Sequence, residues 1–460
     1  MDYSAANPAM WELIVTLGIL AVALGIALEL RNRFTFIRRG MMPTAVLAGF
    51  LLLGVKETGI VRLNESILEA LVYHTIAMGF IAMSLRKALR PVGKDGKRAG
   101  RVTGLKSGAT IVGTYLIQGF TGLVISMTLA MFMPRVFQAS GLLLPMGFGQ
   151  GPGQANNIGA TYESMGFAGG RSYGLAIAAA GYLCACTIGV LILRGWAKKP
   201  FPRDGKTRQE SREQGDVSMF QAPNEIPVSD SIDRFSVQII LVFSVYLATY
   251  LLTWGITAMI TAISPGLGNT VNTLLWGFNF ILGSALAMGV GKLLDVRMKQ
   301  DVMRREYRNN YLLSRLSGFF FDLMITAGIA SIRTEDISGL WIPFLLTIAA
   351  GAAVTWFFLK WASAHAFAGY EREGLISMFG MLTGTIGSGI LLLKELDPNL
   401  ETPAANNLVI GSSYGIVLGA PMLVFVSLAA RSTMMCLITL ALIVIYWFGL
   451  CMLIRSKAHT

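Results

Sequence analysis

Two glycine-rich stretches hold the residues of this sequence that could do chemistry inside an apolar chain. The first, Pro145 to Gly153, reads PMGFGQGPG, and the second, Thr383 to Gly389, reads TGTIGSG. From Val136 to Gly170 there is no Lys or Arg and a single acid, Glu163, yet nine of the thirty residues from 141 to 170 are glycine. Such a segment is apolar enough to enter a membrane but too rich in glycine to cross it as one helix.

Broken helices inside a membrane expose main-chain groups that continuous helices hide. Free N–H groups at a helix N-terminus favour anions, and free C=O groups favour Na⁺ or H⁺. The side chains beside the two stretches are amides and hydroxyls, which suit the same ligands. We therefore predict a substrate-binding site made of Gly149, Gln150, Gly151, Gly153, Gln154, Asn156, Gly384, Gly387, Ser388, Gly389 and Asn406. The alternative is that the glycines only allow close helix packing, as small residues do in membranes generally.

Ionisable side chains inside apolar segments are the second group of candidates, because a charge within the membrane is costly. Asp322 is predicted to couple a cation or to contact the substrate, with a structural hydrogen bond as the alternative. His74 could have a functional part or lie as a neutral group within the helix bundle. The residues predicted to take part in ion coupling are Asp322, Thr383, Thr385, Asn157 and Asn407. Arg171 is expected to reach toward water at the membrane surface, although it could also meet an anion.

Composition places both stretches in a polytopic helical membrane protein. The 460 residues are 54% hydrophobic and 14% charged, whereas soluble domains have about 25% charged residues. About eleven segments approach the roughly 20 apolar residues that a span needs, among them Trp11 to Leu30, Met42 to Gly54 and Met434 to Ile454. The four cysteines fall in such segments and are expected to be buried thiols. No cofactor, bound metal or nucleic acid is expected.

Basic residues cluster in alternate loops, which orients the spans by the positive-inside rule. On this topology the N-terminus is outside and the C-terminus is cytoplasmic. Of the 38 Lys and Arg residues, six lie outside: Lys56, Arg62, Arg135, Arg171, Arg333 and Arg431. The first glycine-rich stretch then enters and leaves from outside, and the second from inside. Each arm of the first is ~15 to 18 Å long as helix, half of the ~30 Å hydrocarbon core, so two re-entrant hairpins of opposite sense are predicted.

The predicted fold is two inverted repeats of five transmembrane helices plus one re-entrant hairpin each, with an additional C-terminal helix. The predicted parts are a first repeat at 1–199 with its hairpin at about 137–170, a cytoplasmic linker at 200–233, a second repeat at 234–430 with its hairpin at about 374–396, and an extra span at 431–460. Ser172-Tyr173-Gly174, after the first hairpin, matches Ser413-Tyr414-Gly415 after the second. The segments that begin at His74 and Asp322 form a second matching pair. Inverted repeats are typical of secondary transporters.

The chain resembles the sodium/glutamate symporter family of bacterial inner membranes in four patches and in the helix after each hairpin. The patches are LVYHTIAMGFIAMSLR (71–86), FGQGPGQANNIG (148–159), FFFDLMITAGIA (319–330) and TGTIGSG (383–389). The resemblance implies Na⁺-coupled symport of glutamate or a similar small carboxylate by a homodimer that works as an elevator, with H⁺ as the other possible coupling ion. The family's first tip looks like GGHGTG. Gln150 and Pro152 replace its imidazole and its hydroxyl. This changes the side-chain ligands but keeps the glycine-rich break that exposes main-chain groups.

Three other classes of function remain open at this point. A carrier of another dicarboxylate or hydroxycarboxylate, or a Na⁺/H⁺ exchanger that uses Asp322, would share this architecture. A passive channel is a further possibility, but broken helices in opposed repeats suit alternating access better. An intramembrane protease needs two apposed acids or an HExxH motif, and the sequence offers neither. We therefore expect a protein that is not an enzyme.

Overall fold

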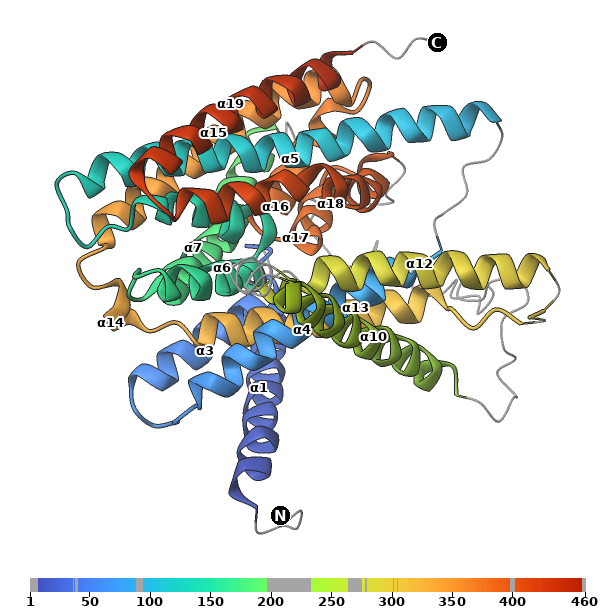
Figure 1. Ribbon diagram of the computed structural model, residues 1–460, viewed down its shortest axis with the longest axis horizontal. Coiled ribbons are helices and arrows are strands. Elements are labelled where there is room, and N and C mark those ends of the chain that lie inside the picture. The colour runs from blue at the N-terminus through green and yellow to red at the C-terminus, as the bar shows by residue number, and fades with distance from the viewer. Residues whose placement is uncertain are drawn as a thin grey trace. The chain divides into compact units, whose positions relative to one another are not determined.

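The structure is a computed structural model, and Figure 1 shows its elements in chain order. It describes residues 7–35, 37, 40–87, 94–196, 233–263, 275–277, 279–300, 302–303, 305–397 and 402–456, with residues 9 and 94–101 described by their main chain alone. Within these ranges the regular elements are all helices, with no strand. The predicted linker at 200–233 lies outside the described residues, except for Asp233.

Ten of the described helical segments are long and apolar enough to cross a membrane. The chain is therefore a multi-pass helical membrane protein, as its composition predicts. The helices that supply these spans are α1 (Pro8–Arg33), α4 (Glu65–Leu85), α5 (Lys94–Ala130), α7 (Gly170–Cys184) continued by η3 (Ala185–Gly189) and α8 (Val190–Trp196), α10 (Arg234–Ile263), α12 (Asn279–Lys299), α13 (Asn310–Ala330), α15 (Trp341–Ala366), α18 (Ala404–Ala429) and α19 (Thr433–Arg455).

The prediction of eleven spans was wrong at Met42 to Gly54. Helix α3 (Thr44–Glu57) has 14 residues, or about 21 Å of helix, which is shorter than the ~30 Å hydrocarbon core. It begins after Pro43 and ends among the polar residues before Gly59, whose φ of 73° is left-handed. The helix is no shorter than the predicted apolar run, so the mistake was to count so short a run as a span.

Shorter elements fill the two glycine-rich regions. The first stretch follows η1 (Gln138–Leu142, a 3₁₀ helix), contains η2 (Pro145–Gln150, a π-helix) and includes the start of α6 (Pro152–Ser164). The second stretch joins α16 (Glu371–Thr383) to α17 (Ile386–Leu393), and a single turn, α14 (Thr334–Ile337), precedes α15. Both stretches therefore form helix, break and helix.

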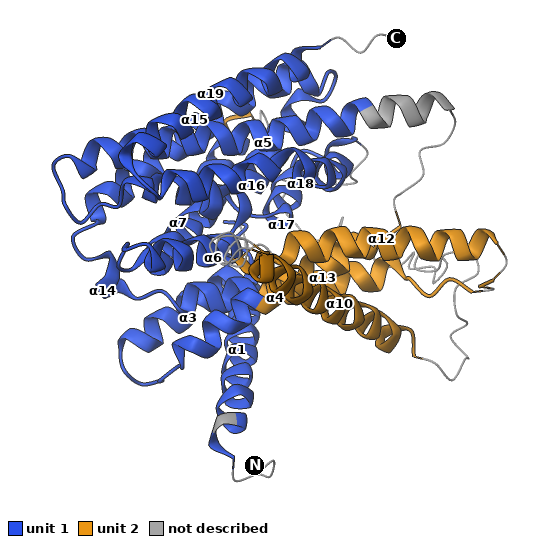
Figure 2. Ribbon diagram, viewed as in Figure 1, with its two compact units in different colours: residues 1–73, 91–193, 323–460 blue, residues 74–90, 194–322 orange. Residues whose placement is uncertain are grey.

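The chain divides into two compact units, coloured separately in Figure 2. Unit 1 contains residues 1–73, 91–193 and 323–460, and unit 2 contains residues 74–90 and 194–322. Each unit draws on both halves of the sequence. The division crosses α4 between Tyr73 and His74, and α13 between Asp322 and Leu323.

Helix α5 is the central helix of unit 1, where it packs against α15, α18 and α19. Glycines on α5 let these neighbours approach. A β-carbon at Gly108 would lie 2.6 Å from Cβ of Tyr414 on α18, and one at Gly113 would lie 2.8 Å from the Phe358 ring of α15. The hydrophobic effect does not drive helix association in lipid, so the close van der Waals packing that small residues permit takes its place.

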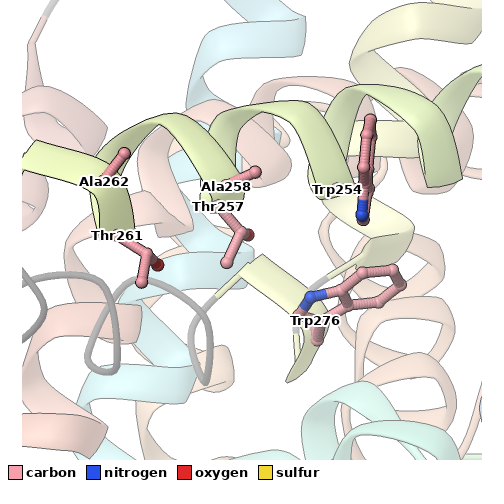
Figure 3. Close-up of a pocket in the computed structure, with 6 residues that line it drawn as sticks. All are labelled: Trp254, Thr257, Ala258, Thr261, Ala262 and Trp276. Carbon is pink, nitrogen blue, oxygen red and sulfur yellow. The ribbon is translucent and has the colours of Figure 1, made fainter.

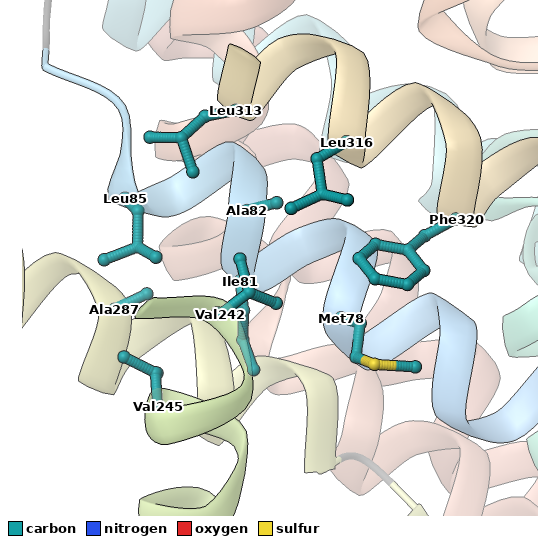
Figure 4. Packing of buried hydrophobic residues seen from close by; sticks show 10 residues of the cluster. All are labelled: Met78, Ile81, Ala82, Leu85, Val242, Val245, Ala287, Leu313, Leu316 and Phe320. Atoms are coloured by element: carbon teal, nitrogen blue, oxygen red, sulfur yellow. The ribbon is translucent and has the colours of Figure 1, made fainter. Parts of the chain in front are cut away.

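Unit 2 combines an open aromatic pocket with a closed apolar core. Trp254, Thr257 and Thr261 of α10 face Trp276 across the pocket, which has a volume of about 350 Å³ (Figure 3). The core holds together the unit 2 part of α4 with α10, α12 and α13 (Figure 4). Its buried members are Met78, Ile81, Ala82, Leu85, Val242, Val245, Ala287, Leu313, Leu316 and Phe320.

Polar groups join the ends of the same helices in unit 2. Glu306, which is 1% exposed, pairs with Arg308 at 3.0 Å and with Nζ of Lys87 at 2.5 Å. Arg308 also contacts Asp295 of α12 at 2.5 Å and donates to the Gly291 carbonyl. Buried charges need such partners, because an unpaired charge in this position would be costly.

Candidate functional site

The first break lies at Gly151, between the π-helix η2 and α6. Gly151 has φ 90° and ψ −176°, a conformation that side chains other than glycine rarely adopt. Pro152 follows as the first residue of α6, where its missing N–H removes one of the free donors of the helix N-terminus. The sequence GPG thus produces a sharp reversal with the start of a new helix directly after it.

The second break lies at Gly384 and Thr385, between α16 and α17. Thr385 is extended, with φ −140° and ψ 171°, and α17 starts at Ile386. The two helices then pack closely, because a β-carbon at Gly380 would lie 2.9 Å from Cα of Gly389. Some glycines of the second region, Gly389 among them, therefore serve close packing, as the alternative interpretation of the sequence proposed.

Helix α7 brings the two breaks together within unit 1. Gly181 lies directly against the carbonyl oxygen of Thr383 at the second break, and its ideal β-carbon would be 3.0 Å from the ring of Phe148 at the first. The next residue, Tyr182, contacts both breaks: a β-carbon at Gly384 would lie 3.2 Å from its ring, and one at Gly151 would lie 3.7 Å from its hydroxyl. Tyr182 is fully buried.

Helix α5 supplies donors to the carbonyl side of both breaks. Tyr115 donates its hydroxyl to the Gly149 carbonyl at 3.1 Å, and Gln118 donates its amide to the Leu382 carbonyl at 3.0 Å. Residues three apart lie on one face of a helix. Carbonyls near the C-terminus of a helix have no intrahelical donor, so one face of α5 satisfies such groups at each break.

Several buried polar atoms at the breaks have no hydrogen-bond partner among the described residues. Gln154, which is 1% exposed, leaves both its amide oxygen and its amide nitrogen unpaired. Asn156 Oδ1 and Ser388 Oγ are likewise buried and unpaired. Native proteins rarely leave such groups unsatisfied, so these atoms are available to a ligand. All three residues belong to the predicted substrate set.

The other predicted substrate residues differ in exposure. Gly149, Gly151 and Gly153 are buried beside the first break, and Gln150 is half-buried. At the second break Gly384 is buried, but Gly387 is exposed. Asn406, at the start of α18, is also exposed.

The predicted ion-coupling residues are not all at the breaks. Thr383 lies at the second break, but its hydroxyl donates to the Phe379 carbonyl of its own helix. Asn157 is buried within α6, and Thr385 is half-buried. Asn407 donates its amide to the Tyr370 hydroxyl at 2.8 Å, directly before α16 begins. The structure thus places Asn407 beside the other end of α16, away from the break.

Asp322 and His74 belong to unit 2, whereas both breaks belong to unit 1. Asp322 is an exposed residue of α13. His74 Nδ1 lies 2.6 Å from the hydroxyl of Tyr246 on α10, which also accepts from Asn279 of α12 at 3.5 Å. This bond matches the alternative in which His74 is a satisfied member of the helix bundle.

Arg171 is held by acids at the start of α7. Its guanidinium pairs with Glu69 of α4 and, at 3.1 Å, with Glu163 of α6, and its main-chain N–H donates to Glu163 at 3.0 Å. Burial raises the pKa of Glu163, against the opposing effect of the bond from Arg171. The two acids occupy the guanidinium, so the structure favours a structural part for Arg171 over anion binding.

Residues missed by the sequence argument are those that face the breaks from unbroken helices. Tyr115, Gln118 and Tyr182 are polar groups in long apolar spans, which is the signal that could have identified them. Within the described residues no group of three His, Cys, Asp or Glu could hold a metal ion. A ligand at the breaks would meet amides, hydroxyls and main-chain groups.

Comparisons of the chain with protein-family models, with curated proteins and with solved structures find no match.

Proposed function

We propose that this protein is a secondary active transporter that carries glutamate or a similar small carboxylate together with Na⁺. The observation that carries the proposal is the meeting of two helix breaks in unit 1, where Tyr182 lies within 4 Å of the position that a β-carbon would take on the glycine of each break. Two broken helices that meet at one place are the usual solution for binding a charged solute and an ion in a membrane.

A carboxylate suits the N-terminal side of each break. Helix α6 starts at Pro152 and has 13 residues, and α17 starts at Ile386. The first turn of a helix presents free N–H groups and a positive dipole end. Gln154, in the first turn of α6, adds an unpaired amide that is 1% exposed. A solute with two carboxylates could engage both helix ends.

The inverted repeats and re-entrant hairpins are part of the same proposal. Supporting it, the helix that follows each predicted hairpin, α7 and α18, carries the sequence Ser-Tyr-Gly. These copies differ in their contacts, because Gly174 packs against Ala155 of α6 whereas its counterpart Gly415 lies beside Ile111 of α5. The repeats would therefore share topology more closely than packing.

An elevator movement, a homodimer and a place in a bacterial inner membrane complete the proposal. They rest on the resemblance of the hairpin sequences to sodium/glutamate symporters. Gln150 and Pro152, which replace the family's imidazole and hydroxyl, are the positions at which the solute could differ from glutamate.

Two measurements test the transport proposal. In a thermal unfolding screen of the purified protein with small carboxylates, a ligand that binds the folded state should raise the unfolding temperature. In proteoliposomes, an inward Na⁺ gradient should then drive accumulation of that carboxylate, and a Na⁺ ionophore should abolish it. If no carboxylate accumulates under a Na⁺ gradient, the proposal fails.

A second candidate is exchange of Na⁺ for H⁺ at Asp322. The observation that favours it is an acid in the apolar helix α13, since such acids usually line a path for ions. Asp322→Asn should then abolish Na⁺-dependent acidification in proteoliposomes. Full coupled transport by this variant would exclude the exchange mechanism and leave the carboxylate carrier in place.

A further inference from the structure

The side chain of Gln118 is oriented without ambiguity. Its amide nitrogen donates to the Leu382 carbonyl at 3.0 Å and to Oγ1 of Thr355 at 2.8 Å. A carbonyl can only accept a hydrogen bond, and the Thr355 hydroxyl uses its own hydrogen on the Gly351 carbonyl. Both neighbours therefore require a donor, which fixes the nitrogen on their side and Oε1 on the other.

Oε1 of Gln118 is a buried acceptor with nothing to accept. The residue is 0% exposed, and this oxygen has no hydrogen-bond partner among the described residues. It faces the first break, because a β-carbon placed on Gly149 would lie 3.2 Å from it. The Gly149 carbonyl already accepts from Tyr115. An unpaired amide oxygen in an apolar interior is costly unless a ligand satisfies it.

Neutral oxygen atoms of other side chains are also left unpaired at the two breaks. Gln154, Asn156 and Ser388 each carry a buried unpaired oxygen at one of the two breaks. Residues 102–130, 138–162 and 374–393 contain no Asp or Glu. A divalent cation normally requires carboxylate ligands, whereas carbonyl and hydroxyl oxygens at helix breaks suit a monovalent cation.

We infer that Gln118 Oε1 is a ligand of a monovalent inorganic cation bound beside the first break, with Na⁺ as the expected ion. The inference deepens the proposed function and rests on it, because the cation would be the coupling ion. It also assigns ion binding to a continuous helix, α5, rather than to the predicted residues Asp322 or Asn407. Through its nitrogen, the same side chain links the cation to the end of α16.

The test measures ion binding without any solute. Thermal unfolding of the purified full-length protein is followed as NaCl replaces choline chloride at constant ionic strength. The wild-type protein should unfold at a temperature that rises with Na⁺ and saturates. Gln118→Met, which keeps the length of the side chain and removes the oxygen, should raise the half-saturating Na⁺ concentration by about 10- to 100-fold.

Two further variants separate the oxygen from the packing around it. Thr355→Val removes one acceptor of the Gln118 amide but leaves Oε1, so it should keep the Na⁺ response. Gln118→Glu keeps an oxygen at this position and adds negative charge, so it should lower the half-saturating Na⁺ concentration. This variant decides the question if Gln118→Met does not fold.

No Na⁺ response in wild type, or an unchanged response in both Gln118 variants, overturns the inference. Stabilisation by an ammonium-bearing solute but not by Na⁺ overturns it too. Carboxylate accumulation would separately decide the proposed function.

Discussion

Gly181 of α7 lies directly against the carbonyl oxygen of Thr383, the last residue of α16, with no room for a β-carbon between them. On the same helix, Tyr182 lies within 4 Å of the position that a β-carbon would take on the glycine of each break. One unbroken turn of α7 therefore fixes the separation of the two breaks. Because protein interiors are close-packed, any group added here must displace one of the broken helices.

Gly181→Ala should disrupt this contact. The added methyl group would overlap the Thr383 carbonyl, and overpacking of this kind typically costs about 1–3 kcal/mol. Gly195→Ala is the matched control, because nothing lies within 4 Å of a β-carbon at Gly195 on the continuation of the same span. We expect Gly181→Ala to lower the unfolding temperature and abolish carboxylate accumulation, while Gly195→Ala preserves both. Equal behaviour of the two variants would contradict the close contact.

Gly151→Ala tests the backbone conformation of the first break. Its φ of 90° should make any substitution strained, by about 1–3 kcal/mol, although the nearest atom to a β-carbon there is 3.7 Å away. The loss should therefore come from the backbone and not from a clash. Because ψ is −176°, the residue is outside the left-handed helical region, and Gly151→Asn should destabilise the protein as much as Gly151→Ala. Recovery of stability with Asn, measured by thermal unfolding, would show that the residue is in the left-handed helical region instead.

Many of the helices could be predicted from the sequence, because a membrane span is recognisable as a long run of apolar residues. The predicted segment Met434 to Ile454, for example, agrees with the observed α19, Thr433–Arg455. The breaks at Gly151 and Gly384 were predictable as well, since clustered glycine and proline have local effects on the backbone. The number of spans was overestimated, because the short apolar run that forms α3, Thr44–Glu57, was counted as a span although polar residues follow it directly.

The hydrogen-bond partners of the polar groups that face the breaks could not be predicted from the sequence. Tyr115 and Gln118 stand in an apolar span, and only the packing of α5 against both broken helices shows which carbonyls they reach. Exposure was equally hidden. Asn406 and Asn407 are adjacent in sequence, yet one is exposed and the other is bonded to Tyr370.

Arg171→Gln should reduce stability and leave solute affinity unchanged. The substitution removes the charge that holds Glu69 and Glu163 together, and bonds to charged groups typically contribute about 1.5–3 kcal/mol. Adding Glu163→Gln should recover part of the loss, because one unpaired acid is removed. Arg431→Gln, at an exposed position, serves as the control and should be neutral. A raised KM for carboxylate uptake with unchanged unfolding temperature would instead assign Arg171 to the anion.

Tyr246→Phe tests the structural role of His74. The change removes the hydroxyl that lies 2.6 Å from His74 Nδ1 and 3.5 Å from the Asn279 amide. Loss of this bond should cost about 1 kcal/mol and lower the unfolding temperature. The pH dependence of uptake should stay as in the wild type if His74 carries no transported proton. A shifted pH profile in Tyr246→Phe would show that His74 titrates during transport.

Glu306 should make unit 2 sensitive to acid. Burial alone would raise the pKa of Glu306, but hydrogen bonds from Arg308 and Lys87 hold the pKa below its usual value. A carboxyl whose pKa is lower in the folded state stabilises the protein above the unfolded pKa of ~4.3. That contribution is lost as the pH falls through the folded value. Glu306→Gln should therefore lower the free energy of unfolding by about 1.5–3 kcal/mol at pH 7, because Lys87 loses this partner and Arg308 keeps only Asp295 as an acidic partner among the described residues. Its unfolding temperature should also fall less than that of the wild type on acidification below ~4.3. The exposed Glu335→Gln should follow the wild-type curve, and parallel acid curves for Glu306→Gln and wild type would refute the lowered pKa.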